Sequence, residues 1–341
     1  MKRVYLSIIL IFIFIGNMVA CSNSIIEDNK DIGLEETLDN IFTNIPTESV
    51  DDKNSQISSY FSHSFETPQM MYSGEELRVP VVCSGNIGAK VAYLLVLDGR
   101  PQPYKLSEEG EYSYMHTITI KKGPTTFDFI FQPVVGIVGE KLELCVVNIN
   151  DPEHRVSKDG IAGSKHTSGS IPIVATIEFL ADSSAANLPA VDEGVLSISA
   201  EYADVTAKEI DGWSEDDLRS RSEYTISVNG RDNLSTYWGI STAEPINIHL
   251  ELWGNPDAEF GLLFFKDGKP IAAEEADALL LHNEQGKKLI ADIQIEGLKK
   301  DEESVMYVLL VYRNIYDMTF DGIPWFADAM TYYLIPQEQP R

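Results

Sequence analysis

Histidine is the side chain best suited to bind a metal or to move a proton near neutral pH. The sequence has six: His63, His116, His154, His166, His249 and His282. None forms an HExxH pair or stands at a metal-ligand spacing from another histidine, a cysteine or a cluster of carboxylates. The GxSxG, Walker and GxGxxG motifs are also absent from the sequence. The sequence therefore predicts no catalytic residues, no metal site and no cofactor.

One short segment has the composition of a binding surface. Its apolar residues alternate with other side chains, as in a β-strand with one buried face: Ile246, Ile248, Leu250 and Leu252. The opposite face would carry Asn247, His249, Glu251 and Trp253. A tryptophan beside polar groups can stack on a sugar ring or anchor a protein. We therefore predict that these four residues bind a protein or glycan partner.

Acidic residues outnumber basic ones by 53 to 26, and the formal net charge is −27. Such a chain repels phosphate backbones, so we expect no nucleic-acid partner. A glycosidase needs two carboxylates that face one cleft, and the acidic clusters of this sequence are typical of solvated surface instead. We therefore expect a protein that is not an enzyme. The alternative, a carbohydrate-active enzyme or a glycan-binding accessory subunit, is motivated by Trp213, Trp238, Trp253 and Trp325.

The elements that position these residues are predicted to be β-strands. Apolar residues alternate over 77–83, 112–120 and 127–131, and Gly, Pro and Asp turns separate the runs. Asp98-Gly99 and Asp267-Gly268 each follow an apolar strand and suit a tight hairpin, because both residue types tolerate a positive φ. This pattern predicts an all-β fold built as an antiparallel sandwich.

An internal repeat divides the chain. A shift of 169 positions aligns residues 75–101 with 244–270 without a gap, with identities that include Gly85/Gly254, Asn86/Asn255 and Leu94/Leu263. Two copies of one sandwich unit are therefore predicted at residues 59–182 and 194–341, joined by a linker at 183–193 and stacked end to end.

The first copy resembles an immunoglobulin-like domain. Cys83 and Cys145 lie on an early and a late strand, as the disulfide between the two sheets of that fold requires, and the resemblance implies that they could be bonded. Two observations point the other way. Leu142, Leu144 and Val146 form the apolar face of their strand, which turns Cys145 away from it, and the second copy has a leucine in place of Cys83. The disulfide is therefore left open.

Two segments of the second copy, residues 261–265 and 305–312, are apolar on both faces. Either another part of the chain covers them or they form an apolar patch for a partner. We expect residues 195–240 to supply the cover.

The N-terminus carries a sorting signal. Lys2 and Arg3 precede an apolar run at residues 4–15, and Met18-Val19-Ala20-Cys21 resembles the lipobox of bacterial lipoproteins. This resemblance implies that residues 1–20 are a signal peptide and that Cys21 is diacylated. It also implies that the mature protein is extracytoplasmic and anchored in a membrane by its lipid. Residues 21–58 are then an acidic tether, with apolar spacing that allows a short helix.

These predictions combine into one function. We expect a cell-envelope or surface lipoprotein with two immunoglobulin-like sandwiches that bind an extracytoplasmic protein or glycan without catalysis. The solute-binding lipoprotein of a transporter is a third alternative, although it would need two α/β lobes that the strand-rich pattern does not predict.

Overall fold

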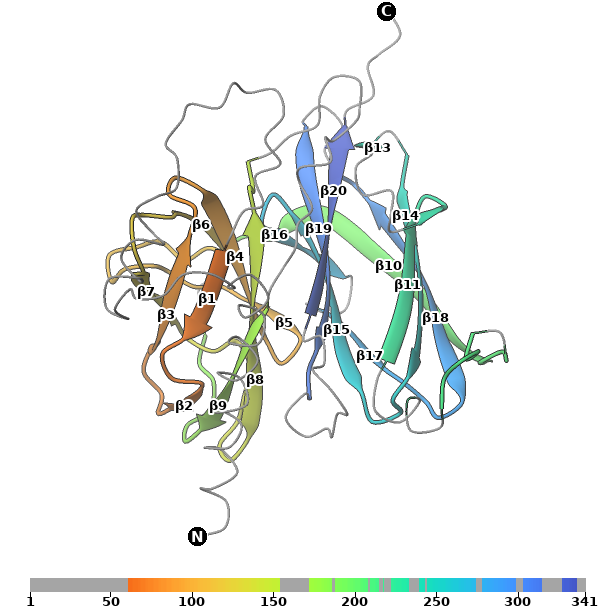
Figure 1. The fold of residues 1–341 in the computed structure, drawn as a ribbon, viewed down its shortest axis with the longest axis horizontal. Helices are drawn as coiled ribbons and strands as arrows, with labels where there is room; N and C mark the ends of the chain where they lie inside the picture. The colour runs from red at the N-terminus through yellow and green to blue at the C-terminus, as the bar shows by residue number, and fades with distance from the viewer. Residues whose placement is uncertain are drawn as a thin grey trace, which may run out of the picture. The chain divides into compact units, whose positions relative to one another are not determined.

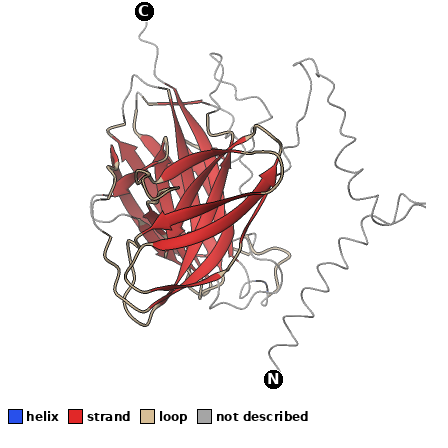
Figure 2. Ribbon diagram, turned by 90° about the vertical axis from the view of Figure 1, so that its left-hand side faces the viewer, coloured by secondary structure: helices blue, strands red, loops and turns tan. Residues whose placement is uncertain are grey.

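The computed structural model describes residues 61–153, 172–185 and 188–335, with gaps at 208, 215–216, 218–221, 233–238, 243, 274–277, 299–302 and 315–326. The predicted signal peptide, Cys21 and the acidic tether lie outside the described residues. Within the described part, all twenty named elements are β-strands, as Figure 2 shows. A search of the same residues finds no helix whose length and apolar character would let it cross a membrane.

The first sandwich is built from nine strands in two sheets (Figure 1). One sheet has the order β1-β3-β7 and the other β2-β9-β8-β4-β5, with β6 also paired to β4. The bounds are β1 (Phe61–Phe65), β2 (Gln69–Tyr72), β3 (Leu77–Gly85), β4 (Lys90–Leu97), β5 (Arg100–Gln102), β6 (Met115–Thr119), β7 (Thr125–Phe131), β8 (Lys141–Asn150) and β9 (Ile173–Phe179).

The second sandwich uses the remaining strands. The order β12-β11-β14-β18-β10 continues into β16-β15-β19-β20-β13, because β10 pairs with both β18 and β16; β17 also pairs with β15. The bounds are β10 (Asp192–Asp204), β11 (Ser222–Val228), β12 (Arg231–Asp232), β13 (Gly239–Ser241), β14 (Ile246–Gly254), β15 (Glu259–Lys266), β16 (Lys269–Ala273), β17 (Leu279–His282), β18 (Lys287–Glu296), β19 (Ser304–Tyr312) and β20 (Ala327–Ile335).

The two halves share one strand-pairing scheme. β3 lies between β1 and β7, and β14 lies between β11 and β18, with every pairing antiparallel. β4 pairs with β5, β6 and β8, and β15 pairs with β16, β17 and β19. Even the parallel edge pair recurs, as β2 with β9 and β13 with β20. Val81 and Leu250 thus occupy the same topological position, and the fold is a pair of immunoglobulin-like sandwiches.

Local sequence explains the strands. The expected apolar face of β3 is buried in the core of the first sandwich, and the matching face of β14 is buried in the core of the second. The predicted hairpins are also present, since φ is positive at Asp98 (49°), Gly99 (70°), Asp267 (47°) and Gly268 (81°).

The two sandwiches pack face to face, so the expected end-to-end stacking is wrong. Leu94 on β4 pairs with Val147 on β8, and the equivalent Leu263 on β15 pairs with Leu309 on β19. All four side chains lie in one buried cluster. The same surface of the duplicated unit is therefore buried in both copies, as in an isologous dimer.

This packing supplies half of the expected cover. Residues 195–240 contribute Leu196, Ile226 and Val228 to the core that buries one face of β15 and β19, and the first sandwich covers the other face. The two apolar sheet faces bury each other, and each Å² of apolar area removed from water contributes about 25 cal/mol to stability.

Cys83 and Cys145 are both free and buried, so they form no disulfide. Cys83 points into the core of the first sandwich, whereas Cys145 points from the opposite face of its sheet into the cluster between the sandwiches. Successive side chains of a strand alternate between the faces, and Cys145 follows the core residue Leu144. One sheet therefore separates the two thiols.

Candidate functional site

The outer face of β14 is lined by polar side chains. Asn247 is exposed and His249 and Glu251 are partly exposed, while the residues between them are buried. This alternation follows from the two-residue period of a strand. The structure therefore places three of the four predicted binding residues on one open face.

Trp253 is the exception, and its predicted exposure is wrong. The side chain is 8% exposed, so its ring cannot serve as a stacking platform. Its neighbour across the strands is Lys288, whose Nζ forms an ion pair with Glu209 in the segment after β10. The alternation of β14 by itself could not reveal that this end of the strand is buried on both faces.

The neighbouring strands extend the polar face. Cross-strand register puts Ser227 of β11 beside His249, His249 beside Asp292 of β18, and Asp292 beside Ser199 of β10. Asn247 is in turn aligned with Gln294, whose Nε2 donates a hydrogen bond to Oδ1 of Asn247 at 3.3 Å. Polar side chains from four adjacent strands therefore share this face.

These residues line an open groove with a volume of about 640 Å³. We call it the polar groove and define it by Ser197, Ser199, Ser227, Asn247, His249, Asp292 and Gln294. The sequence identified Asn247 and His249 but missed the residues on β10, β11 and β18. The alternation of Ile293 and Ile295 with Asp292 and Gln294 is a signal of the same kind, but only the strand pairing shows that it adjoins β14.

His249 is held between two carboxylates. Its Nδ1 lies 2.7 Å from Oδ1 of Asp292, and its Nε2 lies 3.5 Å from Oε1 of Glu251. The hydrogen bond to Asp292 is the main reason that the pKa of His249 is raised above its ordinary value, and Glu251 acts in the same direction. Both contacts stabilise the imidazolium form.

Glu251 also connects the groove to a second ion-pair group. Its Oε2 lies 3.0 Å from Nζ of Lys288, which is also paired with Glu209. Burial lowers the pKa of Lys288, but its hydrogen bonds to the two carboxylates outweigh burial and raise it overall. The hydrogen bond from Lys288 is the main cause that lowers the pKa of Glu209 to about 2. Both shifts favour the charged forms of Lys288 and Glu209, whose ion pair adjoins Glu251.

The arrangement differs from a hydrolytic triad. Ser227, His249 and Asp292 lie in one row, but Nε2, the nitrogen that would have to activate the serine, faces Glu251. Both ring nitrogens of His249 therefore face carboxylates, whereas the histidine of a triad directs one nitrogen at the serine. Among the described residues, no group of three or more His, Cys, Asp or Glu side chains has the geometry to hold a metal ion.

The other three histidines in the described part of the chain do not line the groove. Nε2 of His116 is 2.8 Å from the carbonyl oxygen of Tyr104, and burial lowers the pKa of His116. His63 packs against Tyr93, and His282 packs against Tyr202. His154 and His166 lie outside the described residues.

Comparison with known proteins identifies no family. No protein-family profile matches the chain, and no curated protein matches it.

Solved structures to which it is similar include the CsuC–CsuE chaperone and tip-adhesion subunit pre-assembly complex of Acinetobacter baumannii Csu pili. That match has 9% identity and a TM-score of 0.20, and it covers 82% of this chain and 100% of the other. The YadV chaperone matches at 10% identity and a TM-score of 0.23, over 80% of this chain and 98% of the other. The CBD12 region of CALX1.2 matches at 10% identity and a TM-score of 0.20, over 81% and 99%. Likeness at these TM-scores contributes nothing to the functional argument, which rests on the groove.

Proposed function

We propose that this protein is a non-catalytic binding module of the cell envelope and that the polar groove is the surface that takes its partner. The observation that supports this most strongly is the convergence of hydrogen-bonding side chains from β10, β11, β14 and β18 on one open groove. Polar groups that line a concavity fix the orientation of a ligand and give specificity.

The chemistry of the groove favours a protein segment as its ligand. Serine hydroxyls and the amides of Asn247 and Gln294 can donate to and accept from a peptide backbone. The exposed carboxylate of Asp292 and the strongly acidic chain favour a segment that carries positive charge. A glycan is the second candidate, but Trp253, the aromatic ring predicted on this face, is buried, and Trp238 and Trp325 lie outside the described residues.

Binding is tested with the acyl-free mature chain as bait and an envelope extract from the host. Asn247→Ala combined with Asp292→Ala should reduce recovery of a specific partner at least several-fold, because each change removes hydrogen-bonding groups from the groove. Thr117→Ala, an exposed polar residue on β6 of the first sandwich, is the matched control and should bind like the parent. Equal recovery by the groove variant and the control would discard the groove as the binding surface.

We also propose that lipid on Cys21 anchors the protein outside the cytoplasm. The motif at residues 18–21 supports this proposal. Metabolic labelling with a clickable fatty acid should mark the parent protein, and Cys21→Ser should remove both the label and membrane retention. Labelling that persists in Cys21→Ser would refute the assignment.

A further inference from the structure

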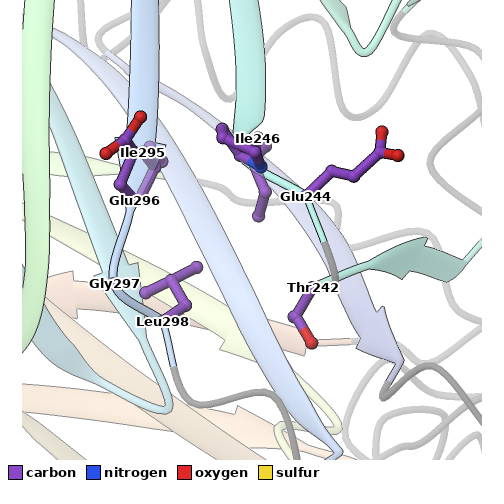
Figure 3. Close-up of a pocket in the computed structure, with 8 residues that line it drawn as sticks. Thr242, Glu244, Ile246, Ile295, Glu296, Gly297 and Leu298 are labelled. Carbon is purple, nitrogen blue, oxygen red and sulfur yellow. The ribbon is translucent and has the colours of Figure 1, made fainter. Parts of the chain in front are cut away.

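A second cavity lies at the end of the second sandwich, where β14 begins and β18 ends. Its volume is about 210 Å³. Figure 3 shows Glu244 beside β14, Glu296 at the end of β18, and Thr242 and Leu298 below them. The exposed rim is formed by Glu244, Pro245, Glu296 and Gly297, and the buried floor by Thr242, Ile246, Ile295 and Leu298. The cavity is therefore open to solvent, with apolar walls and two carboxylates at its mouth.

The floor contains a polar atom without a partner. Thr242 is 4% exposed, and its Oγ1 makes no hydrogen bond. A buried hydroxyl without a partner is destabilising, because it has lost its hydrogen bonds to water and gained none in the protein. The presence of Thr242 in the cavity is explained if a ligand supplies the partner that its hydroxyl lacks.

The duplication shows what the cavity lacks. Leu77 pairs with Phe131 in the first sandwich, and the equivalent pair in the second sandwich is Ile246 with Ile295. Gln132, which follows Phe131, is therefore equivalent to Glu296, which follows Ile295. The parallel edge pairs, β2 with β9 in the first sandwich and β13 with β20 in the second, have the same register relative to their neighbouring strands. When the two pairs are aligned, Thr242 takes the position of Tyr72. Thr242 therefore stands where the first sandwich has a tyrosine.

In the first sandwich that tyrosine fills the space. Tyr72 is fully buried, and its ring packs against Phe179 at a centroid distance of 5.4 Å. Its hydroxyl donates a 2.7 Å hydrogen bond to Oε1 of Gln132. In the second sandwich the ring is missing and a carboxylate replaces the amide acceptor. A cavity of about 150 Å³ in a protein core is known to take a benzene molecule, so this one has room for a single ring.

We propose that the cavity binds a phenol group in the position that the Tyr72 ring occupies in the first sandwich. Glu296 accepts a hydrogen bond from the phenolic hydroxyl, as Gln132 does from Tyr72, and the hydroxyl of Thr242, at the opposite end of the space, donates to the face of the ring. Ile246, Ile295 and Leu298 enclose the ring. This ligand is either a small free phenol or a tyrosine side chain of a partner protein. The site is separate from the polar groove.

The test is titration of the mature protein with p-cresol, which is the side chain of tyrosine without its backbone. We expect saturable binding by calorimetry, and toluene, which lacks the hydroxyl, should bind about tenfold or more weakly. Thr242→Tyr should abolish p-cresol binding and raise the Tm, because the new ring fills the cavity as Tyr72 does. Absence of saturable p-cresol binding, or equal binding by Thr242→Tyr and the parent, would overturn the proposal.

Two further variants keep the result interpretable. Thr242→Val preserves the size of the side chain at the floor of the cavity. This variant should fold and bind p-cresol more weakly than the parent, even if Thr242→Tyr does not fold. Glu296→Gln should retain p-cresol, since Gln132 accepts the same bond from Tyr72. If Glu296→Gln lost p-cresol while the parent bound an alkylamine more tightly, the ligand would be a cation and the phenol assignment would be wrong.

The source of the phenol is distinguished by a second probe. N-acetyltyrosinamide carries the ring together with a flanking backbone. Binding of both probes assigns the cavity to a tyrosine of a partner, and binding of p-cresol alone assigns it to a small phenol, because the rim then excludes the backbone.

Discussion

Arg313 and Asp98 join the two sandwiches through a bidentate ion pair. Nη2 of Arg313 lies 2.9 Å from Oδ1 and 3.0 Å from Oδ2 of Asp98, and Nε lies 3.2 Å from Oδ1. The side chains are 18% and 17% exposed. Asp98 is in the hairpin between β4 and β5, and Arg313 follows β19, so the pair bridges the first copy to the second.

Removing Arg313 should destabilise the protein measurably. Arg313→Ala leaves the Asp98 carboxylate in a largely buried site without its partner, and we expect a loss of about 2 kcal/mol in the free energy of unfolding. Urea denaturation gives the value. Lys141→Ala, which breaks an exposed pair with Glu178, is the control and should cost less than about 1 kcal/mol. Equal effects of the two changes would mean that the ion pair does not hold the interface.

Gly261 should tolerate no side chain. A Cβ at this position would lie 2.6 Å from both Cα and O of Gly99, which is a backbone collision between the two sandwiches. We expect Gly261→Ala to cost about 1–3 kcal/mol, because one backbone must move. Differential scanning calorimetry should show a lowered Tm, while Thr117→Ala stays within about 0.5 kcal/mol of the parent. An unchanged Tm in Gly261→Ala would contradict the observed packing.

The two internal cysteines should behave as protected thiols. Burial raises the pKa of Cys83 and of Cys145, and less thiolate means slower reaction with disulfide reagents. In native buffer we expect neither thiol to react with a chromogenic thiol reagent, and in denaturant both thiols should react. Mass spectrometry of the denatured, unreduced protein should show two alkylated internal cysteines. A mass two hydrogens lower, with no alkylation, would show that a disulfide exists.

The His249 contacts predict a pH dependence with a definite sign. Since Asp292 raises the folded-state pKa of His249, its contribution to stability is fully present below the unfolded value of about 6.5 and is lost as pH rises through the folded value. In an NMR titration, Asp292→Asn should lower the pKa of His249. Ser199→Ala, a neutral change in the same row, should leave it near that of the parent. If Asp292→Asn left the pKa unchanged, the hydrogen bond would not be its cause.

The sequence predicted the strands and the repeat because each depends on local pattern. The alternation around Leu250 gives the buried face of β14 directly, and the positive φ of Asp267 follows from the Asp-Gly pair. The burial of Trp253 could not be predicted, since the alternation along β14 assigns it to the exposed face and only packing in the folded chain buries it.

The packing of the copies depends on contacts between residues far apart in the chain. Leu94 and Leu263 each belong to strands that are apolar on both faces, which indicates that a second layer exists but not which layer it is. The position of Cys145 on its strand already indicated that its side chain points away from the core face. The ring that is missing from the cavity at Thr242 is identified only when the two copies are compared position by position.

The polar groove is the surface proposed to meet a partner, and site-directed photo-cross-linking in the intact host tests this directly. A cross-linking amino acid at Ser199, in the groove, should give a discrete adduct that disappears when Asn247→Ala and Asp292→Ala are added. The same amino acid at Thr117 should not give that adduct. Adducts that are identical at both positions, or a Ser199 adduct that survives the two alanine changes, would contradict the assignment of the groove.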